Sequence, residues 1–444
     1  MGLIATLRRL FGRRPEPDPV PSAWGTPGPP EPEPKPSSKG PADASEPSTG
    51  WDGPPLAVPL GPLKYETSLV RTEPSDEIVS REPYAYARFG PGDGTFLDLS
   101  RDGDDGWLDD FGLPRLHTPA ALADWLGVPL GRLFWLTGRT RRHTPRNGSH
   151  YVASWVGKRS GGHRLIESPK PSLRAVQDRI LTGILNLVPP HASAHGFRGG
   201  RSIVTNAGPH AGAAVLLKQD LVDFYGTVRR GRVVAVFRTL GFSREVAIWL
   251  AELTTCRAPT DLPAPGLSAE LGFTSPAAPF LRPHLPQGAP TSPALANLSA
   301  FGLDVRLGGL ARAFGATYTR YADDLTFSGG PDFITALRQF IPLSERIIRD
   351  ERLKPNRAKR KVVRSHQRMR VTGVVVNERP NVARDEFDRL KATLHNCLKT
   401  GPAPQNRDGV TDFRSHLRGR IAFVQQCNAE RGAKLLAMFD RIAW

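Results

Sequence analysis

Two adjacent aspartates, Asp323 and Asp324, are the residues whose type and spacing most directly indicate chemistry. They lie within residues 320–328, Arg-Tyr-Ala-Asp-Asp-Leu-Thr-Phe-Ser, between apolar or aromatic residues. The alternation predicts two short strands joined by a tight Asp-Asp turn that aims both carboxylates at a cleft. Paired carboxylates held in this way suit two divalent cations, which can clamp both ends of a phosphoryl displacement. The alternative is an exposed acidic hairpin tip without a ligand.

A third carboxylate follows an earlier apolar run. Asp220 ends the strand-like segment 213–219, and Asp223 comes three residues later. Residues at that spacing cannot lie on one face of a continuing strand, so we expect only Asp220 to join Asp323 at a metal site. Asp223 then has a structural role, such as capping the next turn. Taken alone, Asp220 also fits a turn or a helix cap.

A loop-to-helix junction precedes the acidic hairpin. Residues 285–293 read Leu-Pro-Gln-Gly-Ala-Pro-Thr-Ser-Pro, ahead of a helix rich in small residues. Gln287 and Gly288 let the backbone approach a flat ligand closely, and the Ser/Thr pair can cap the helix. Taken alone, the segment also fits an ordinary junction without a ligand.

The elements that must position these residues are helices and short strands in mixed order. Periodicity and Gly/Pro signals predict where they begin and end. We expect helices at 119–137 (two, broken near Val128-Pro129), 171–188, 243–254, 291–314, about 331–350, 384–399 and 411–431, and strands within 151–168 (around Gly161-Gly162), 213–219, the acidic hairpin, 360–364 and 370–376. Residues 257–284 are Pro-rich and indicate a long loop.

Charge and composition divide the 444 residues into a tail and a basic body. From 15 to 62 nearly every second or third residue is Pro, Gly, Ser or an acid, which predicts a disordered tail. Residues 1–90 carry 10 Lys/Arg and 12 Asp/Glu, so of the net charge of +17 the remaining residues carry +19. A basic folded body attracts phosphate backbones, which makes nucleic acid the expected partner.

The segment 352–370 concentrates this charge, with nine Lys/Arg and no acid. It is either a solvated strand and loop or a surface for template or primer phosphates, which would make binding strongly dependent on salt.

Several classes of protein are excluded by simple counts. No run of 18 or more apolar residues occurs, so no membrane helix is expected. The basic segment 1–14 lacks the small-residue cleavage site of a signal peptide. Cys256, Cys397 and Cys427 show no zinc-ligand or redox spacing, which is typical of reduced thiols in a cytoplasmic protein.

Together, these motifs resemble those of reverse transcriptases, and more narrowly those of bacterial retron reverse transcriptases. Asp220 in its strand, Leu-Pro-Gln-Gly and Tyr-Ala-Asp-Asp occur in that family's order. Three further segments match: His195-Gly196-Phe197-Arg198 with Arg201-Ser202, the Asn-Ala-x-x-His element at 206–210, and the Val-Thr-Gly element at 371–373. The resemblance covers roughly residues 110–444. Lys218-Gln219 and Gly226-Thr227 depart from the family's usual residues.

The resemblance implies a role for each matching residue. Asp220, Asp323 and Asp324 match the catalytic carboxylates, which hold two Mg²⁺ ions that Mn²⁺ can replace. Tyr225 matches an aromatic gate that excludes a ribose 2′-hydroxyl, and Phe224 beside it is expected in the core. The remaining matches are Lys158, Arg164, Gln287 and Lys359 for nucleotide binding, and Asn206, His210, Val371, Thr372 and Gly373 for RNA binding.

The implied fold is α+β, a right-hand polymerase whose palm carries an antiparallel sheet. We expect a disordered Pro-rich tail at 1–90 and an N-terminal helical segment at 91–150. The polymerase parts then follow as fingers at 151–215, palm at 216–378 (with 230–285 partly fingers or an inserted loop) and a helical thumb at 379–444.

The implied activity is RNA-directed DNA polymerisation on a cognate structured non-coding RNA, with dNTPs as substrates. The product is RNA-linked single-stranded DNA (msDNA), and the implied role is antiphage defence with an effector protein. One alternative is another bacterial reverse transcriptase, group II intron-like or defence-associated. The other is a catalytically idle RNA-binding antitoxin subunit.

Overall fold

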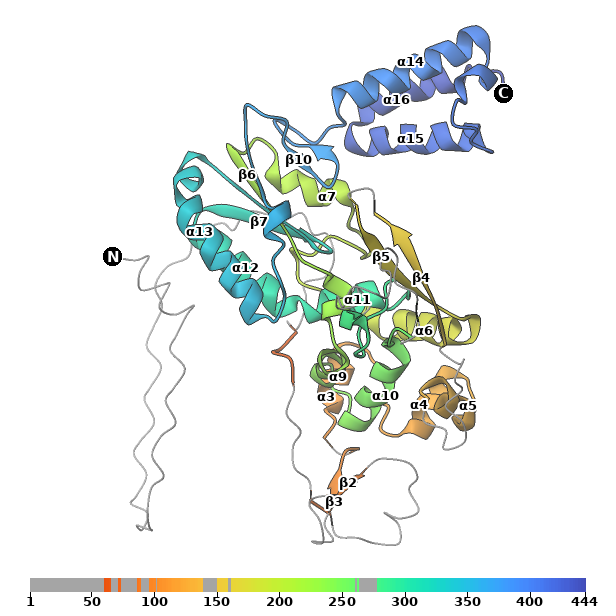
Figure 1. Ribbon diagram of the computed structural model, residues 1–444, viewed down its shortest axis with the longest axis vertical. Coiled ribbons are helices and arrows are strands. Elements are labelled where there is room, and N and C mark those ends of the chain that lie inside the picture. The colour runs from red at the N-terminus through yellow and green to blue at the C-terminus, as the bar shows by residue number, and fades with distance from the viewer. Residues whose placement is uncertain are drawn as a thin grey trace, which may run out of the picture. The chain divides into compact units, whose positions relative to one another are not determined.

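The computed structural model describes residues 60–64, 71–72, 86–88, 96–100, 102–138, 150–158, 161–259, 262 and 278–444 (Figure 1). Most of the expected tail, and much of the loop expected at 257–284, lie outside the described residues. The helices are α3 (Asp105–Asp110), α4 (Pro119–Leu126), α5 (Leu130–Leu136), α6 (Pro171–Gly183), α7 (Ile203–Ala207), α8 (Phe224–Thr227), α9 (Arg230–Thr239), α10 (Arg244–Thr254), α11 (Ser292–Ser299), α12 (Phe301–Ala313), α13 (Pro331–Asp350), α14 (Arg384–Thr400), α15 (Phe413–Cys427) and α16 (Ala429–Phe439).

Within the described residues, the strands form four separate antiparallel sheets. The largest has the strand order β7-β8-β6-β9, and the smaller ones pair β1-β3-β2, β4-β5 and β10-β11. Their bounds are β1 (Arg71–Thr72), β2 (Tyr86–Arg88), β3 (Phe96–Asp98), β4 (Tyr151–Gly157), β5 (His163–Pro169), β6 (Val215–Asp220), β7 (Ala316–Tyr321), β8 (Asp324–Gly329), β9 (Lys361–Arg364), β10 (Arg370–Val371) and β11 (Val374–Val375). Helices and antiparallel sheets together make the fold α+β, as the sequence predicts.

The four-stranded sheet is held by an aromatic core. Phe340 of α13 makes edge contacts with Phe327 of β8 and with Phe333, at ring distances of 4.9 and 5.0 Å. Phe327 stacks in turn on Tyr318 of β7 at 4.9 Å. Aromatic pairs at these distances add to the free energy gained by burial. This packing fixes β7 and β8, which carry the acidic hairpin.

The C-terminal part packs around its own apolar cluster. Leu390, Leu394, Leu417 and Leu435 of α14, α15 and α16 are buried with residues of β10 and β11, and Figure 1 shows the three helices side by side. The single helix expected at 411–431 is instead two helices. Asn428 interrupts them because its side chain accepts a hydrogen bond from the Arg431 amide and begins α16.

Two other sequence predictions need a similar refinement. The helix expected at 291–314 divides at Ala300 into α11 and α12. The strand expected at 370–376 is a hairpin, because Thr372 and Gly373 both have positive φ (47° and 90°) and reverse the chain. Over the described residues, no helix has both the length and the apolar character that crossing a membrane requires.

Candidate active site

The acidic hairpin differs from the sequence prediction in where it turns. Tyr321 pairs directly with Asp324, so the turn consists of Ala322 and Asp323, and Asp324 is the first residue of β8. The expected Asp-Asp turn is therefore wrong by one residue. Ala322 adopts a positive φ of 55°, which is costly for a residue with a Cβ atom. Of the two aspartates, only Asp323 therefore lies in the turn, at the end of the sheet.

The three aspartates meet where β6 and β8 end. Asp220 is paired with Asp324 across the two strands, and the Leu221 amide donates to the Asp323 carbonyl at 3.0 Å. Burial raises the pKa of Asp323, and the charges of Asp324 and Asp220 raise it further. Burial likewise raises the pKa of Asp324; Lys218 lowers it in part and Asp220 adds to the rise. Crowded acids of this kind favour a cation at the site.

Two residues from one short segment contact Asp220. The Asn356 side chain donates to Oδ1 at 3.1 Å, and the Lys359 ammonium lies 3.2 Å from Oδ2. The Asn356 amide also donates to the Asp220 carbonyl at 2.7 Å. Lys359 therefore lies at the carboxylates themselves, which is consistent with its expected place near the reacting phosphates.

A buried ion pair supports the hairpin from behind. Arg320, at the end of β7, donates two hydrogen bonds to Asp304 of α12, at 2.8 and 2.6 Å, and both side chains are fully buried. It also donates to Asn297 of α11 and to the Ala322 carbonyl in the turn. The turn that carries Asp323 is thus tied to two helices.

The His195-Gly196-Phe197-Arg198 segment lies directly against the same turn. The His195 amide donates to the Arg320 carbonyl at 2.8 Å. A Cβ atom on Gly196 would lie 2.9 Å from the Ala322 nitrogen, so glycine is needed for this close approach. The Phe197 ring lies 5.9 Å from that of Tyr321. This motif supports the hairpin by packing.

One cavity of about 950 Å³ joins the residues expected to bind a nucleotide. Its lining includes carboxylates from the end of the sheet, cations from the β4-β5 hairpin and side chains from the loop before α11. The sequence-predicted residues that line it are Lys158, Arg164, Asp220, Tyr225, Gln287, Asp323 and Lys359. Asp324, the first residue of β8, is the one expected catalytic carboxylate that is not among the residues lining this cavity.

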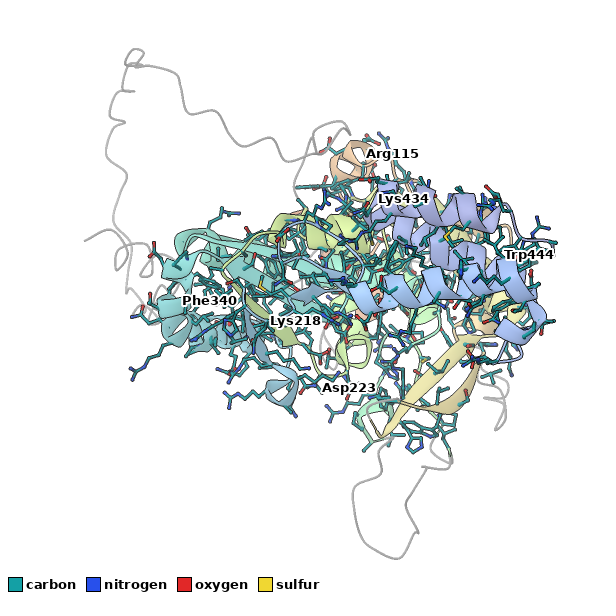
Figure 2. All side chains as sticks on the ribbon, turned by 90° about the horizontal axis from the view of Figure 1, so that it is seen from above. Arg115, Lys218, Asp223, Phe340, Lys434 and Trp444 are labelled. Atoms are coloured by element: carbon teal, nitrogen blue, oxygen red, sulfur yellow. The ribbon has the colours of Figure 1, made fainter. Side chains whose placement is uncertain are left out.

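Tyr225 and its neighbours differ sharply in exposure. Tyr225 lines the cavity, and burial, followed by the charge of Asp323, raises its pKa to about 12, so the ring is neutral. Phe224 is buried, as expected. Asp223 is exposed (Figure 2) and lies at the N-cap position of α8, but its side chain makes no capping hydrogen bond. A Cβ on Gly226 would lie 2.8 Å from the Phe280 ring, which explains this departure from the family pattern.

The basic segment 352–370 is partly neutralised within the protein. Glu345 of α13, which is buried, accepts hydrogen bonds from Arg357 and Arg360. Further along, Arg368 pairs with Asp385 and Arg370 with Glu386. These ion pairs offset part of the charge, and Lys354, Lys361 and Arg364 are exposed to solvent, where phosphates can be contacted.

The Asn-Ala-x-x-His element faces inward. Asn206 and His210 are both fully buried. The two His210 ring nitrogens hydrogen bond to Ser328 of β8 and Thr319 of β7, at 2.7 and 2.8 Å. Burial lowers the pKa of His210 to about 3. His210 therefore joins the two strands of the acidic hairpin as a neutral side chain.

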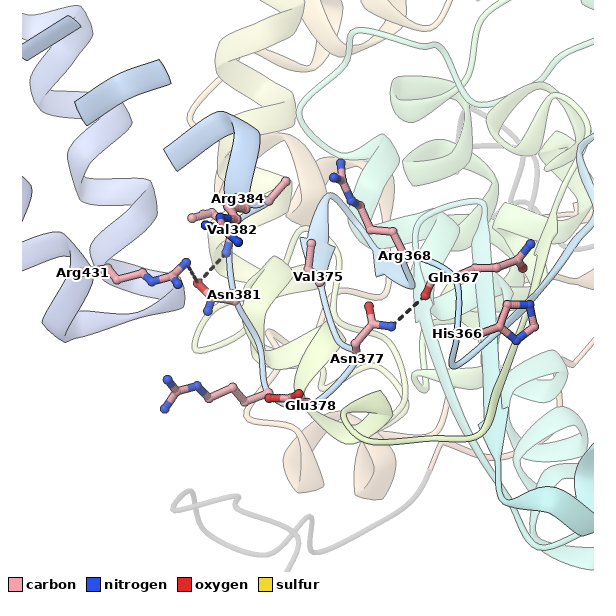
Figure 3. Close-up of a pocket in the computed structure, with 12 residues that line it drawn as sticks. His366, Gln367, Arg368, Val375, Asn377, Glu378, Asn381, Val382, Arg384 and Arg431 are labelled. Atoms are coloured by element: carbon pink, nitrogen blue, oxygen red, sulfur yellow. Dashed lines mark hydrogen bonds between the residues drawn. The ribbon is translucent and has the colours of Figure 1, made fainter. Parts of the chain in front are cut away.

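The Val-Thr-Gly element lies against this segment. The Thr372 hydroxyl donates to the Ile203 carbonyl at 3.1 Å and accepts from the Asn206 side chain at 3.4 Å. Val371 is buried and Gly373 is exposed. A second, strongly basic pocket lies next to the β10-β11 hairpin (Figure 3). It is lined by residues 366–368, part of the segment 375–384, and Arg431. The two motifs thus form one unit, in which Pro209 and Gly373 are exposed and Thr372 is partly exposed.

Sequence reasoning missed the residues that hold the site from behind. Asn356 contacts Asp220, and Arg320 contacts the turn that carries Asp323. An arginine at the end of an otherwise uncharged strand was a usable signal. A buried cluster of Glu167, Cys256 and His284 is the one set of three His, Cys, Asp or Glu residues, within the described chain, whose ligand atoms all lie within 4.8 Å. The aspartates are spread more widely.

Comparisons with known proteins agree with this geometry. Residues 156–376 match the family model "Reverse transcriptase (RNA-dependent DNA polymerase)". The chain is 41% identical to the retron Mx65 reverse transcriptase of Myxococcus xanthus, covering 75% of this chain and 73% of that protein. It is 36% identical to the retron Mx162 enzyme of the same organism, covering 74% and 68% respectively. Retron Ec86 reverse transcriptase of Escherichia coli is 29% identical, with 63% and 76% covered. The chain therefore belongs to the retron reverse transcriptases and is an RNA-directed DNA polymerase.

Proposed function

We propose that this protein copies part of a cognate structured RNA into single-stranded DNA that stays linked to the RNA (msDNA). The observation that carries this proposal is the shared cavity. Asp220, Asp323, Tyr225 and Gln287 face it from the sheet end and the loop before α11, and the cations of the β4-β5 hairpin face it from the other side. A triphosphate needs several converging cations, and this cavity offers them close to carboxylates.

The α+β architecture supports a right-hand assignment. We assign the fingers to 151–215, the palm to 216–378 with 230–285 partly fingers, and the thumb to 379–444. The palm assignment rests on the antiparallel β7-β8-β6-β9 sheet with the aspartates at its end. The thumb assignment rests on the helical cluster of α14, α15 and α16. We assign 91–150 to an N-terminal segment, whose described residues form β3, α3, α4 and α5. Residues 1–90 stay a predicted tail, although β1 and β2 within that range pair with β3.

The aspartates fit two Mg²⁺ ions, which Mn²⁺ can replace. All the donors are carboxylate oxygens, which hard divalent cations prefer. The raised pKa values of Asp323 and Asp324 reflect burial and mutual repulsion that a cation would relieve. Two ions would serve both the attacking and the leaving oxygen of the proposed displacement. Asp220 and Asp323 are the principal ligands, and Asp324 is the third.

In the proposed reaction, a hydroxyl of the primer attacks the α-phosphate of a dNTP and pyrophosphate leaves. The hydroxyl is a 3′-hydroxyl or, in the first step, an internal guanosine 2′-hydroxyl. Bound ions would activate the hydroxyl and stabilise the leaving group. Lys158 and Arg164 hold the triphosphate by charge, and Lys359 compensates charge beside Asp220. Tyr225 and Gln287 shape the pocket for a deoxynucleotide.

For the cognate RNA, we propose that residues 206–210 and 371–373 act as one unit. Since Asn206, His210 and Val371 are buried, their side chains position the 372–373 turn, and Thr372 and Gly373 offer the surface that RNA contacts. Exposed lysines and arginines of 352–370 supply phosphate contacts.

The wider role is proposed by analogy with the family. The partners are the cognate RNA, its DNA product, dNTPs and an effector protein, and the setting is antiphage defence in the cytoplasm.

The test is to extract small nucleic acids from cells that carry the locus with the wild-type protein or the Asp323→Asn variant. We expect RNA-linked DNA only with the wild type. If the RNA is transcribed and no linked DNA appears, a different bacterial reverse transcriptase is favoured. A wild-type protein that binds RNA but incorporates no dNTP would favour the antitoxin alternative.

A further inference from the structure

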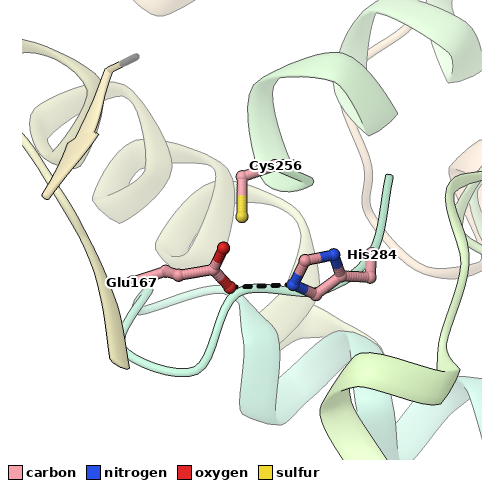
Figure 4. Close-up of side chains that lie close together, drawn as sticks. All are labelled: Glu167, Cys256 and His284. Carbon is pink, nitrogen blue, oxygen red and sulfur yellow. Dashed lines mark hydrogen bonds and ion pairs between the residues drawn. The ribbon is translucent and has the colours of Figure 1, made fainter. Parts of the chain in front are cut away.

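Three buried side chains from separate segments meet outside the aspartate site. Glu167 lies on β5, Cys256 follows α10, and His284 precedes the loop that carries Gln287 (Figure 4). Their exposed fractions are 2%, 8% and 0%. One carboxylate oxygen, the thiol sulfur and one ring nitrogen all lie within 4.8 Å of one another. Neither the proposed polymerase chemistry nor the RNA contacts use this cluster.

The main chain holds the three residues in place. Cys256 and His284 exchange two backbone hydrogen bonds, both at 3.0 Å. The Glu167 amide donates to the Gln287 carbonyl at 3.0 Å, and the Gly288 position admits no Cβ because it would lie 2.9 Å from the Glu167 carbonyl. The donor atoms are therefore preorganised, which lowers the cost of binding a ligand there.

The hydrogen bonds of His284 fix the orientation of its ring. Nδ1 lies 2.9 Å from the Arg282 carbonyl, which can only accept, so Nδ1 carries a hydrogen. Nε2 lies 2.8 Å from Oε2 of Glu167, so one hydrogen, carried by the ring or by the carboxyl group, joins them. The nitrogen available to a metal therefore points at the carboxylate and lies within 4.8 Å of the thiol sulfur.

The donor set selects the kind of metal. A thiolate, an imidazole nitrogen and a carboxylate oxygen are ligands of Zn²⁺, whereas Mg²⁺ prefers oxygen alone. An Nδ1–H bound to a carbonyl is also the usual orientation of a histidine that binds metal through Nε2. Glu167 and His284 line the large cavity, so a water molecule can complete four-fold coordination.

We propose that Glu167, Cys256 and His284 bind one zinc ion that joins β5 to the segment before Gln287. Loading releases the thiol proton and the hydrogen shared by His284 and Glu167 as Zn²⁺ enters. One Zn²⁺ ion thus replaces two protons, and the net charge of the buried cluster is unchanged. The ion fixes the strand that carries Arg164 relative to Gln287, on two sides of the nucleotide cavity.

The test uses the full chain, purified without chelator, and measures zinc by elemental analysis. We expect about one zinc per chain in the wild type, retained in Cys397→Ser and lost in Cys256→Ser. Cys397 is a matched control because it is also a buried thiol, but lies in α14. Wild-type zinc content no higher than that of Cys256→Ser would overturn the proposal.

A second measurement does not depend on whether the variants fold. Wild-type protein stripped of metal is titrated with Co²⁺ and its absorption spectrum is recorded. We expect a thiolate-to-cobalt charge-transfer band that saturates at one equivalent and disappears when Zn²⁺ is added. A spectrum without that band, from protein with an unchanged melting curve, would show that the cluster holds a proton only. Neither readout depends on polymerase activity.

Discussion

Two hairpins of this protein use similar turns in opposite ways. In the β7-β8 hairpin the turn residue Asp323 faces a cavity, and the strands behind it are fixed by Arg320 and His210. In the β10-β11 hairpin the turn is bound to a neighbouring helix through Thr372, and the apolar strand residues are buried. Motif residues therefore line a cavity in the first hairpin and mainly support the fold in the second, which the sequence pattern alone does not distinguish.

The largest expected effect distinguishes Asp220 from Asp223, two acids beside the β7-β8 hairpin. Asp220→Asn should reduce dNTP incorporation about a thousandfold or more, because it removes a carboxylate that is paired with Asp324 and contacts Lys359. Asp223→Asn changes an exposed acid that lines the same cavity but has no such pairing, and should retain near wild-type rates. Single-turnover incorporation on a primed RNA template measures both. Equal losses in the two variants would contradict the choice of Asp220 over Asp223 as the metal ligand.

The next effect concerns the buried histidines that support the hairpin. Burial lowers the pKa of His210 to about 3 and that of His195 to about 4. The unfolded chain takes up these protons near pH 6.5 and the folded protein does not. Their stabilising contribution is therefore complete above pH 6.5 and is lost as the pH falls towards these lower values.

The quantity to measure is the change in the free energy of unfolding with pH. Between pH 6 and pH 5, each histidine should reduce the free energy of unfolding by roughly 1 kcal/mol. Urea unfolding over this range should show a shallower pH dependence in His210→Gln, with His395→Gln, an exposed histidine, as the control. The same slope in both variants would contradict the neutral, buried state of His210.

A smaller effect is expected at the wall of the cavity. Tyr225→Ala removes the ring proposed to exclude a 2′-hydroxyl, so discrimination against ribonucleotides should fall on the order of tenfold or more. Phe224→Leu changes a buried neighbour and should lower the melting temperature without changing selectivity. The ratio of kcat/KM for dNTP and rNTP measures both. Unchanged selectivity in Tyr225→Ala would exclude it as the gate.

The smallest effect tests the second hairpin. Thr372→Val keeps the side-chain shape but loses the hydrogen bonds to Ile203 and Asn206. A net loss of about 1 kcal/mol would weaken binding of the cognate RNA roughly fivefold. Incorporation on an unrelated primed RNA should be unchanged. Equal effects on both RNAs would show that the β10-β11 hairpin supports DNA synthesis in general and does not recognise the cognate RNA.

Local patterns predicted most of the elements and the place of the aspartates. Strands at 215–220 and 361–364 and the long helix α13 follow from apolar periodicity, and the acidic hairpin was wrong by one residue only because Asp324 pairs with Tyr321. Contacts between distant segments left no such signal. Arg320 with Asp304, Asn356 with Asp220, and the Glu167 cluster depend on tertiary packing, which spacing along the chain cannot show.

The most direct measurement of the central claim is dNTP incorporation on an RNA template with Mg²⁺ by wild type and Asp323→Asn. Asp323 is the residue that the turn presents to the cavity. We expect extended DNA with the wild type, none with the variant, and similar melting temperatures for both. Equal incorporation by the two proteins would contradict the assignment of these aspartates as the site of RNA-directed DNA synthesis.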